Sequence, residues 1–305
     1  MKERLLIGTR GSQLALAQTN QIIEMLKEVK RQYRYENVVI RTQGDRMHDF
    51  GSTAVEGKSL FTKEIEEALA EGRIDIAVHS MKDLTTELPA GLVIAAVPER
   101  ANPRDVLISS NNTKFEKLPG GARVGTSSSR RRAQLLAARG DLEIVEMHGN
   151  VDTRLHKLAK GEYDAIVLAA AGLIRLGLEK HATEFLSTDL MLPAVGQGAL
   201  AVQCRDEDTE TKDLLSNIDH KETRRAVAAE RAFARRLGAD CRTPVAAYAQ
   251  AESGKLAIDG MVASQNGRLT VRTRMVSKDP DPEKVGVELA EALLNKGAAT
   301  ILEAA

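Results

Sequence analysis

Hydroxyl, cationic and carboxylate side chains gather where the predicted buried strands end. The apolar runs that begin at residues 4, 74, 122 and 142 end in or are followed by Arg10, Ser12, Ser80, Lys82, Asp83, Thr126, Ser127, Ser128, Arg130, Arg131, His148, Asn150 and Arg154. Arginine presents a planar fork of N–H donors that fits a carboxylate or a phosphate. The sequence therefore predicts a site for an anionic ligand.

The runs alternate with segments of helical periodicity, which is typical of α/β proteins with open, mostly parallel sheets. Predicted helices cover residues 12–29, 59–72, 130–140 and 151–161, with a further strand over 37–45 and a strand running into a helix over 163–178. The carboxyl ends of parallel strands share one edge, where ligands bind and helix N-termini add free N–H groups. We expect an anion-binding cleft between two α/β blocks.

Each of these residues also has a simpler interpretation. Ser12 and Asp83 suit helix N-caps, three consecutive arginines suit a solvated helix face, and a single histidine is more often structural. What favours a ligand is the shared placement, with Lys and Arg in the first helical turns, where the helix dipole disfavours cations. The sequence has no glycine pattern for phosphates and no metal-ligand spacing among its six histidines.

Composition narrows the class of protein. The 305 residues balance 43 Lys+Arg against 43 Asp+Glu and include no Trp, four Tyr and five Phe, which argues against a nucleic-acid binder. The first residues lack the apolar core of a signal peptide, and no apolar run is long enough to span a membrane. With only two cysteines, we expect a cytoplasmic globular protein without a disulfide framework.

The chain divides into three predicted domains, which are 1–98 with 199–216, then 103–192, then 220–305. In the third, Asp219 with Glu222 resembles a helix capping box, and Asn266-Gly267 predicts a hairpin. Cys204 ends an apolar strand and suits core packing. Cys241 lies in the loop "GADCRTP", where nearby arginines favour a reactive thiolate.

The chain resembles the hydroxymethylbilane synthase, or porphobilinogen deaminase, family over its whole length. The resemblance rests on "IGTRGSQLALAQ", "IDIAVHSMKD", "GTSSSRRRAQL", "GNVDTRLHKL", "YDAIVLAAAGLIRLG", "LPAVGQGALAVQCR" and "ERAFARRLGADCRTP". It implies an α/β fold of two periplasmic-binding-protein-like lobes joined by two crossings. A smaller α+β third domain would carry the cysteine.

The resemblance implies a transferase. A dipyrromethane cofactor would be linked to Cys241 through a thioether and would prime the stepwise addition of four porphobilinogen units, each losing ammonia. The product would be the linear tetrapyrrole hydroxymethylbilane, and the cofactor would stay on the enzyme. A small-molecule substrate, a monomeric state, and no nucleic-acid or membrane partner are expected.

The resemblance also assigns roles to single residues. Asp83 is expected to stabilise the cation that forms when ammonia leaves. The positions expected to hold pyrrole carboxylates are Arg10, Ser12, Lys82, Thr126, Ser127, Ser128, Arg130, Arg131, Arg154 and Arg175. The other expected binding residues are Gln18, Asp45, Lys58, Phe61, Ser80, His148, Asn150 and Gln197, with Phe61 stacking on pyrrole rings. No metal site is expected.

Three positions depart from the family pattern. Ser59 stands where the family has a glycine, Ser129 where it has an apolar residue, and His148 where it has an arginine. His148 in place of an arginine predicts that substrate binding weakens as pH rises through neutrality, because an imidazolium loses its charge there and a guanidinium does not.

Two other functions fit parts of the sequence. A non-catalytic carboxylate-binding protein would have the same two lobes, but it would need no third domain with Cys241 and would normally carry an export signal. An anion-sensing regulator would have a helix-turn-helix before the lobes, and none is present.

Overall fold

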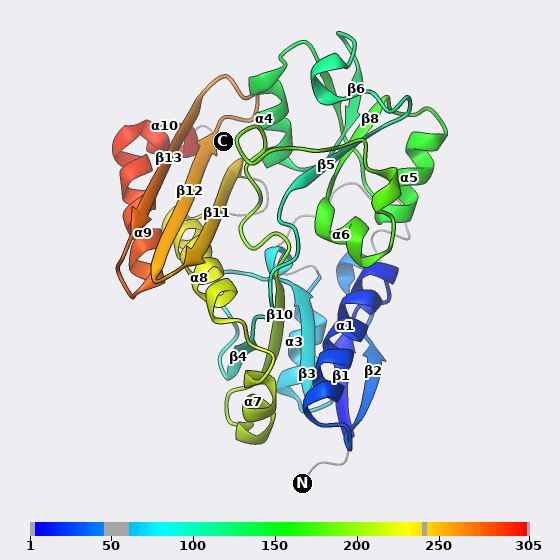
Figure 1. The fold of residues 1–305 in the computed structure, drawn as a ribbon, viewed down its shortest axis with the longest axis vertical. Coiled ribbons are helices and arrows are strands. Elements are labelled where there is room, and N and C mark those ends of the chain that lie inside the picture. Colours follow the sequence, from blue (N-terminus) through cyan, green and yellow to red (C-terminus); the bar gives the residue numbers. More distant parts are fainter. Residues whose placement is uncertain (1–3, 46–60, 240–242, 304–305) are drawn as a thin grey trace. The chain divides into compact units, whose positions relative to one another are not determined.

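The computed structural model describes residues 4–45, 61–239 and 243–303. The chain forms two compact units, Met1–Ala101 with Ala199–Arg224, and Asn102–Gly198 with Arg225–Ala305. Figure 1 colours the chain from the N-terminus in blue to the C-terminus in red. In the described part of the chain, no helix is long and apolar enough to cross a membrane.

The first unit is built on a five-stranded sheet in the order β2-β1-β3-β10-β4. Its strands are β1 (Arg4–Thr9), β2 (Arg34–Val39), β3 (Ile76–Ser80), β4 (Leu92–Ala96) and β10 (Leu200–Arg205). Its helices are α1 (Gln13–Val29), α3 (Lys63–Ala70) and α7 (Thr209–Ser216), with a 3-10 turn at Met81–Asp83. β10 runs antiparallel to both of its neighbours, and the other pairs are parallel.

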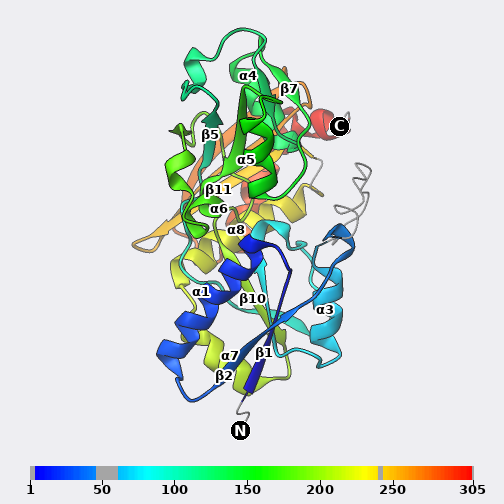
Figure 2. The same ribbon diagram turned by 90° about the vertical axis from the view of Figure 1, so that its right-hand side faces the viewer.

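Alternation along the strands gives this sheet two apolar faces. Leu5 and Ile7 of β1 pack in one cluster with α1 and α7, whereas Leu6 packs with α3 on the opposite face. Figure 2 shows α1 and α3 on the two sides of the sheet. A sheet buried on both faces leaves its strand ends as the place for polar function.

The second unit contains another five-stranded sheet, in the order β7-β6-β8-β5-β9. Its strands are β5 (Asp105–Ser109), β6 (Arg123–Gly125), β7 (Glu143–Val145), β8 (Ala165–Ala169) and β9 (Glu184–Phe185). Its helices are α4 (Ser129–Ala138), α5 (Val151–Ala159) and α6 (Ala170–Arg175), with 3-10 turns at Phe115–Lys117 and Glu179–His181. Here β5 is the strand that runs antiparallel to its neighbours.

The third sheet is an antiparallel meander of β11 (Val245–Glu252), β12 (Lys255–Ala263) and β13 (Thr270–Ser277). Its helices are α8 (Lys221–Arg236), α9 (Pro282–Leu293) and α10 (Ala299–Glu303), with a π turn at Leu294–Ala298. Phe233 of α8 and Leu289 of α9 pack on one face of the sheet. The other face contacts α4 through Met261 and Ala133.

The two α/β lobes and the smaller α+β domain confirm the predicted fold class. The domain boundaries given above stay a prediction. The strand expected over 37–45 was placed too late. β2 spans Arg34–Val39, and four of its six residues are exposed, so it lacks the apolar run of a buried strand.

The predicted capping box at the start of α8 is wrong. The carboxylate of Asp219 accepts the N–H of Val97 and the guanidinium of Arg224, and the ring of His220 instead accepts the N–H of Thr223. Asp219 therefore ties α8 to the segment after β4. The hairpin at Asn266-Gly267 is confirmed, with Gly267 at φ +70°.

Candidate active site

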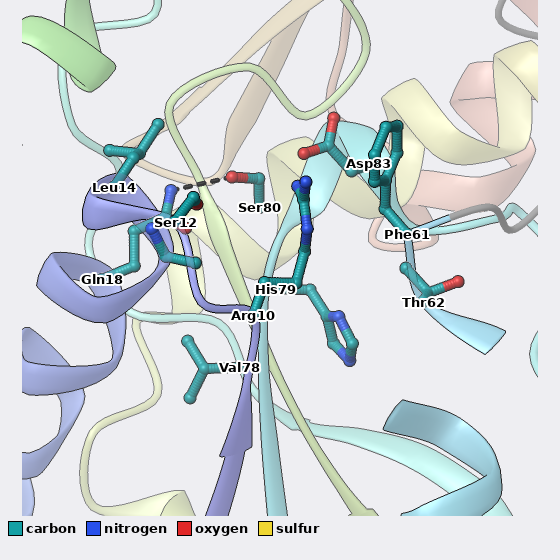
Figure 3. Close-up of a pocket in the computed structure, with 11 residues that line it drawn as sticks. Arg10, Ser12, Leu14, Gln18, Phe61, Thr62, Val78, His79, Ser80 and Asp83 are labelled. Atoms are coloured by element: carbon teal, nitrogen blue, oxygen red, sulfur yellow. Dashed lines mark hydrogen bonds between the residues drawn. The ribbon is translucent and has the colours of Figure 1, made fainter. Parts of the chain in front are cut away.

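A pocket lies at the carboxyl ends of β1 and β3 in the first unit (Figure 3). The first-lobe cluster, as we call it, comprises the predicted residues that line this pocket, Arg10, Ser12, Gln18, Phe61, Ser80 and Asp83. The hydroxyl of Ser12 caps α1 by accepting the N–H of Ala15. The amide of Gln18 donates to the hydroxyl of Ser80 at 2.7 Å, so α1 and β3 are joined at the pocket.

Arg10 has two partners that flank it. Its Nη2 lies 2.5 Å from the Oδ1 of Asp45, and its guanidinium carbon lies 4.1 Å from the centre of the Phe61 ring. Thr42 donates to the same carboxylate at 2.8 Å and fixes it. Burial raises the pKa of Asp45, but Arg10 and Thr42 outweigh this effect and the pKa is lowered. Arg10 is thus neutralised by an acid of the chain itself.

The Phe61 ring is packed on more than one side. A Cβ at Gly44 would lie 2.1 Å from the Cε1 of this ring, so only glycine fits there without a shift. The guanidinium of Arg10 covers part of the ring as well. A pyrrole ring reaches the face beneath Arg10 only if the guanidinium moves away, and the predicted stacking stays a prediction.

Asp83 and Lys82 lie on the 3-10 turn that follows β3, and both are exposed. Asp83 lines the pocket. An exposed carboxylate at a pocket wall is accessible to a cationic ligand. His79, which the sequence analysis did not single out, also lines this pocket and is buried. Burial lowers its pKa to about 4, and the nearby Arg10 acts in the same direction.

The second-lobe cluster lies where β6 ends and α4 begins, in the second unit. The hydroxyl of Ser128 caps α4 by accepting the N–H of Arg131, and the N–H of Ser128 donates to Thr126. Ser127 is exposed. Arg130 and Arg131 point inward and are almost completely buried. We define the cluster by these five residues together with Asp105, Arg154 and Gln197.

Asp105 is the partner of both buried arginines. Its Oδ2 lies 2.8 Å from Nη1 of Arg130, and its Oδ1 lies 2.7 Å from Nη2 of Arg131. Burial raises the pKa of Asp105, but the two guanidiniums hold it at about 2. Asp105 was not predicted from the sequence, since an aspartate at the start of a strand has no distinctive pattern.

Two further predicted arginines of the second unit bond to backbone carbonyls. Arg154 donates from Nε to the oxygen of Gly149 at 2.7 Å, and Arg175 donates to that of Gly198 at 2.9 Å. Burial lowers the pKa of each to about 10, and for Arg154 the charge of Arg131 contributes as well. Arg154 therefore adds positive charge near Arg131.

His148 and Asn150 lie between β7 and α5. The carboxamide of Asn150 caps α5 by accepting the N–H of Thr153. The Nε2 of His148 lies 3.5 Å from the carboxylate of Glu146, a neighbour that the sequence analysis did not consider. The predicted residues Lys58 and Cys241, and the departure at Ser59, lie outside the described residues. In the described ranges, no group of acidic, cysteine and histidine side chains could hold a metal.

Comparison with known proteins identifies the family. The family model "Porphobilinogen deaminase, dipyromethane cofactor binding domain" matches residues 5–213, and "Porphobilinogen deaminase, C-terminal domain" matches residues 224–295. The chain belongs to the porphobilinogen deaminase family. This confirms the predicted family and makes the chain an enzyme, a transferase of tetrapyrrole biosynthesis that works with a dipyrromethane cofactor. The alternative of a non-catalytic binding protein is thereby excluded.

Relatives named porphobilinogen deaminase match almost the whole chain. The protein of Carboxydothermus hydrogenoformans is 48% identical over 303 residues, 99% of this chain and 97% of that protein. The protein of Syntrophus aciditrophicus is 51% identical over 297 residues, 97% of each. Among solved structures, the periplasmic VFT2 domain of Bordetella pertussis BvgS is 11% identical with a TM-score of 0.43. The match covers 71% of this chain and 86% of that domain.

We predict that Arg131→Leu purifies largely without the porphobilinogen deaminase cofactor, because a cofactor carboxylate would lose its charge partner. Such a pair is worth on the order of 4 kcal/mol at ~4 Å and an effective dielectric of about 20. Arg130→Leu should behave in the same way. Arg132→Leu is the matched control, since Arg132 is exposed and bonds only weakly, at 3.3 Å, to the oxygen of Ile144. Intact mass measures the bound cofactor. An equally severe loss in Arg132→Leu would contradict the assignment.

Proposed function

We propose that Cys241 holds the dipyrromethane cofactor through a thioether. We further propose that the first-lobe and second-lobe clusters bind the carboxylates of the cofactor and of the porphobilinogen units. Four such units would be joined stepwise, with loss of ammonia, and hydroxymethylbilane would be released. The proposed binding residues are Arg10, Ser12, Gln18, Asp45, Lys58, Phe61, Ser80, Lys82, Thr126, Ser127, Ser128, Arg130, Arg131, His148, Asn150, Arg154, Arg175 and Gln197.

The observation that carries this proposal is the charge of the second-lobe cluster. Arg130, Arg131 and Arg154 carry three positive charges, and Asp105 supplies one negative charge. The Nε–H of Arg130 is buried and has no acceptor in the described part of the chain. Unpaired buried donors and cations are costly, and ligand carboxylates would satisfy them. A dipyrromethane with acetate and propionate side chains fits this requirement.

We propose that Asp83 is the catalytic residue. When bound, the cofactor supplies the free pyrrole position to which the first unit is joined. The carboxylate of Asp83 stabilises the positive charge that develops on the substrate as ammonia leaves, and it accepts a hydrogen bond from the pyrrole N–H. Arg10 and Ser12 orient the substrate carboxylates, because they lie on the same pocket as Asp83.

We also propose that the enzyme is a cytoplasmic monomer whose partner is its small-molecule substrate, and that it binds neither nucleic acid nor membrane. Equal numbers of acidic and basic residues and the scarcity of aromatic residues support this proposal. So does the role of its relatives in biosynthesis.

The deciding experiment is the intact mass of Cys241→Ser beside that of Cys204→Ser. We expect the wild-type protein to carry an excess of two pyrrole units, and Cys241→Ser to lack it. Cys204→Ser should keep it, because Cys204 is fully buried and burial raises the pKa of its thiol to about 11, so it is a poor nucleophile. A Cys241→Ser protein with the full mass excess and normal turnover would show that the attachment site is wrong.

Asp83→Asn should fold normally and turn over at least ~10²-fold more slowly, since a preorganised charge at the reacting centre is lost. The amide is nearly isosteric and the residue is exposed, so the unfolding temperature should stay unchanged. Glu87→Gln, an exposed acid four positions later, is the control and should leave kcat near wild type. Near-normal turnover of a folded Asp83→Asn protein would remove Asp83 from the mechanism.

His148→Arg should flatten the pH dependence of kcat/KM across neutral pH. In the wild type, we expect kcat/KM to fall as pH rises, because an imidazolium loses its proton and its attraction for a carboxylate, whereas a guanidinium keeps both. Glu146→Gln shows how much of the profile comes from the neighbouring acid 3.5 Å away. Parallel curves for wild type and His148→Arg would mean that His148 does not replace the arginine.

A further inference from the structure

Asp105, the first residue of β5, is fully buried and holds two consecutive arginines of α4. Both guanidiniums reach the same carboxylate, Arg130 through Nη1 and Nη2, and Arg131 through Nε and Nη2. The three side chains are 5%, 8% and 0% exposed for Arg130, Arg131 and Asp105. One carboxylate thus faces two cations out of contact with water.

This arrangement is unfavourable for arginine in two ways. The positive end of the α4 dipole lies at Ser128, so cations in the first turn are repelled. Burial next to another cation adds to the cost, and it lowers the pKa of Arg131 despite the attraction of Asp105. Without a negative charge at Asp105, the two guanidiniums would repel each other and turn toward water.

The remaining bonds of the group fix the direction of each guanidinium. Arg130 donates to the oxygen of Leu192 at 2.7 Å, and Arg131 donates to the oxygen of Val167 at 3.0 Å. The amide of Gln197 donates to the oxygen of Pro103 and to Oδ1 of Asp105. Both cations are therefore held in one orientation before any ligand arrives, and this lowers the entropic cost of binding.

We propose that Asp105 is a positioning residue for the cofactor. Asp105 holds Arg130 and Arg131 in the orientation that binds a carboxylate, and it leaves the arginine pair with one positive charge in excess. This inference rests on the proposed function, because it takes the carboxylate ligand to be that of the dipyrromethane. Asp105 itself does not contact the ligand. It acts through the two arginines.

The first measurement is cofactor loading in Asp105→Asn and Asp105→Glu, by intact mass. The loaded fraction of Asp105→Asn should fall at least ~10-fold, since removing one partner of a buried ion pair leaves the others uncompensated. Asp105→Glu restores the charge at a longer reach and should recover part of the loading. Asp259→Asn is the matched control, because Asp259 lies in the third domain and likewise binds an arginine, Arg272, through both carboxylate oxygens.

The second measurement separates positioning from stability. We expect Asp105→Asn to unfold at a lower temperature than wild type. Sodium sulfate should raise this unfolding temperature more than sodium chloride of equal ionic strength does, since sulfate would replace the missing anion between the guanidiniums. Sulfate also stabilises proteins in general, and the gain of Asp259→Asn measures that general effect. If Asp105→Asn does not fold, the loaded fraction and the gain from sulfate are measured on Asp105→Glu instead.

The proposal is overturned if Asp105→Asn loads cofactor like wild type. It is also overturned if Asp105→Asn and Asp259→Asn lose cofactor loading equally and gain equally in unfolding temperature from sulfate. A wild-type protein without the two-pyrrole mass excess would instead contradict the proposed function. In that case, the sulfate measurement still decides whether Asp105 balances the arginine pair, because it needs no cofactor.

Discussion

The cost of keeping cations out of water before their ligand arrives governs both clusters. An anion-binding site needs guanidiniums, yet a buried guanidinium without a partner is strongly unfavourable. In each lobe, an aspartate from another segment reduces this cost, Asp45 beside Arg10 and Asp105 beside Arg130 and Arg131. The two cases differ in exposure: the first pair is partly open to solvent, and the second is closed to it. Asp45 can therefore yield to a competing carboxylate far more readily than Asp105.

The layered build of both lobes explains why polar residues can gather without weakening the core. Helices cover both faces of each five-stranded sheet, so the apolar clusters are complete without the strand ends. The caps Ser12, Ser128 and Asn150 show how one residue serves two purposes. Each begins a helix by accepting a backbone N–H, and each keeps its helix N-terminus at the edge where anions are expected.

The sequence allowed the elements with strong periodicity to be predicted, and with them the fold class and family. α1 begins one residue after the predicted cap, and the cationic turn of α4 lies where it was expected. Long-range pairing could not be predicted. Asp105 meets Arg130 across 25 positions of sequence, and Asp219 bonds to Val97 rather than capping its own helix. β2 was misplaced because an exposed edge strand is selected by its partner β1, not by its own hydrophobicity.

The order of strands also bears on how the chain is made. β10 lies between β3 and β4 in the first sheet, yet it follows every strand of the second sheet in the sequence. During synthesis the ribosome therefore releases all of β5 to β9 before the first sheet can close. The second sheet is continuous in sequence and can form while the first still exposes β3 and β4 as unpaired edges, the kind of surface that chaperones protect.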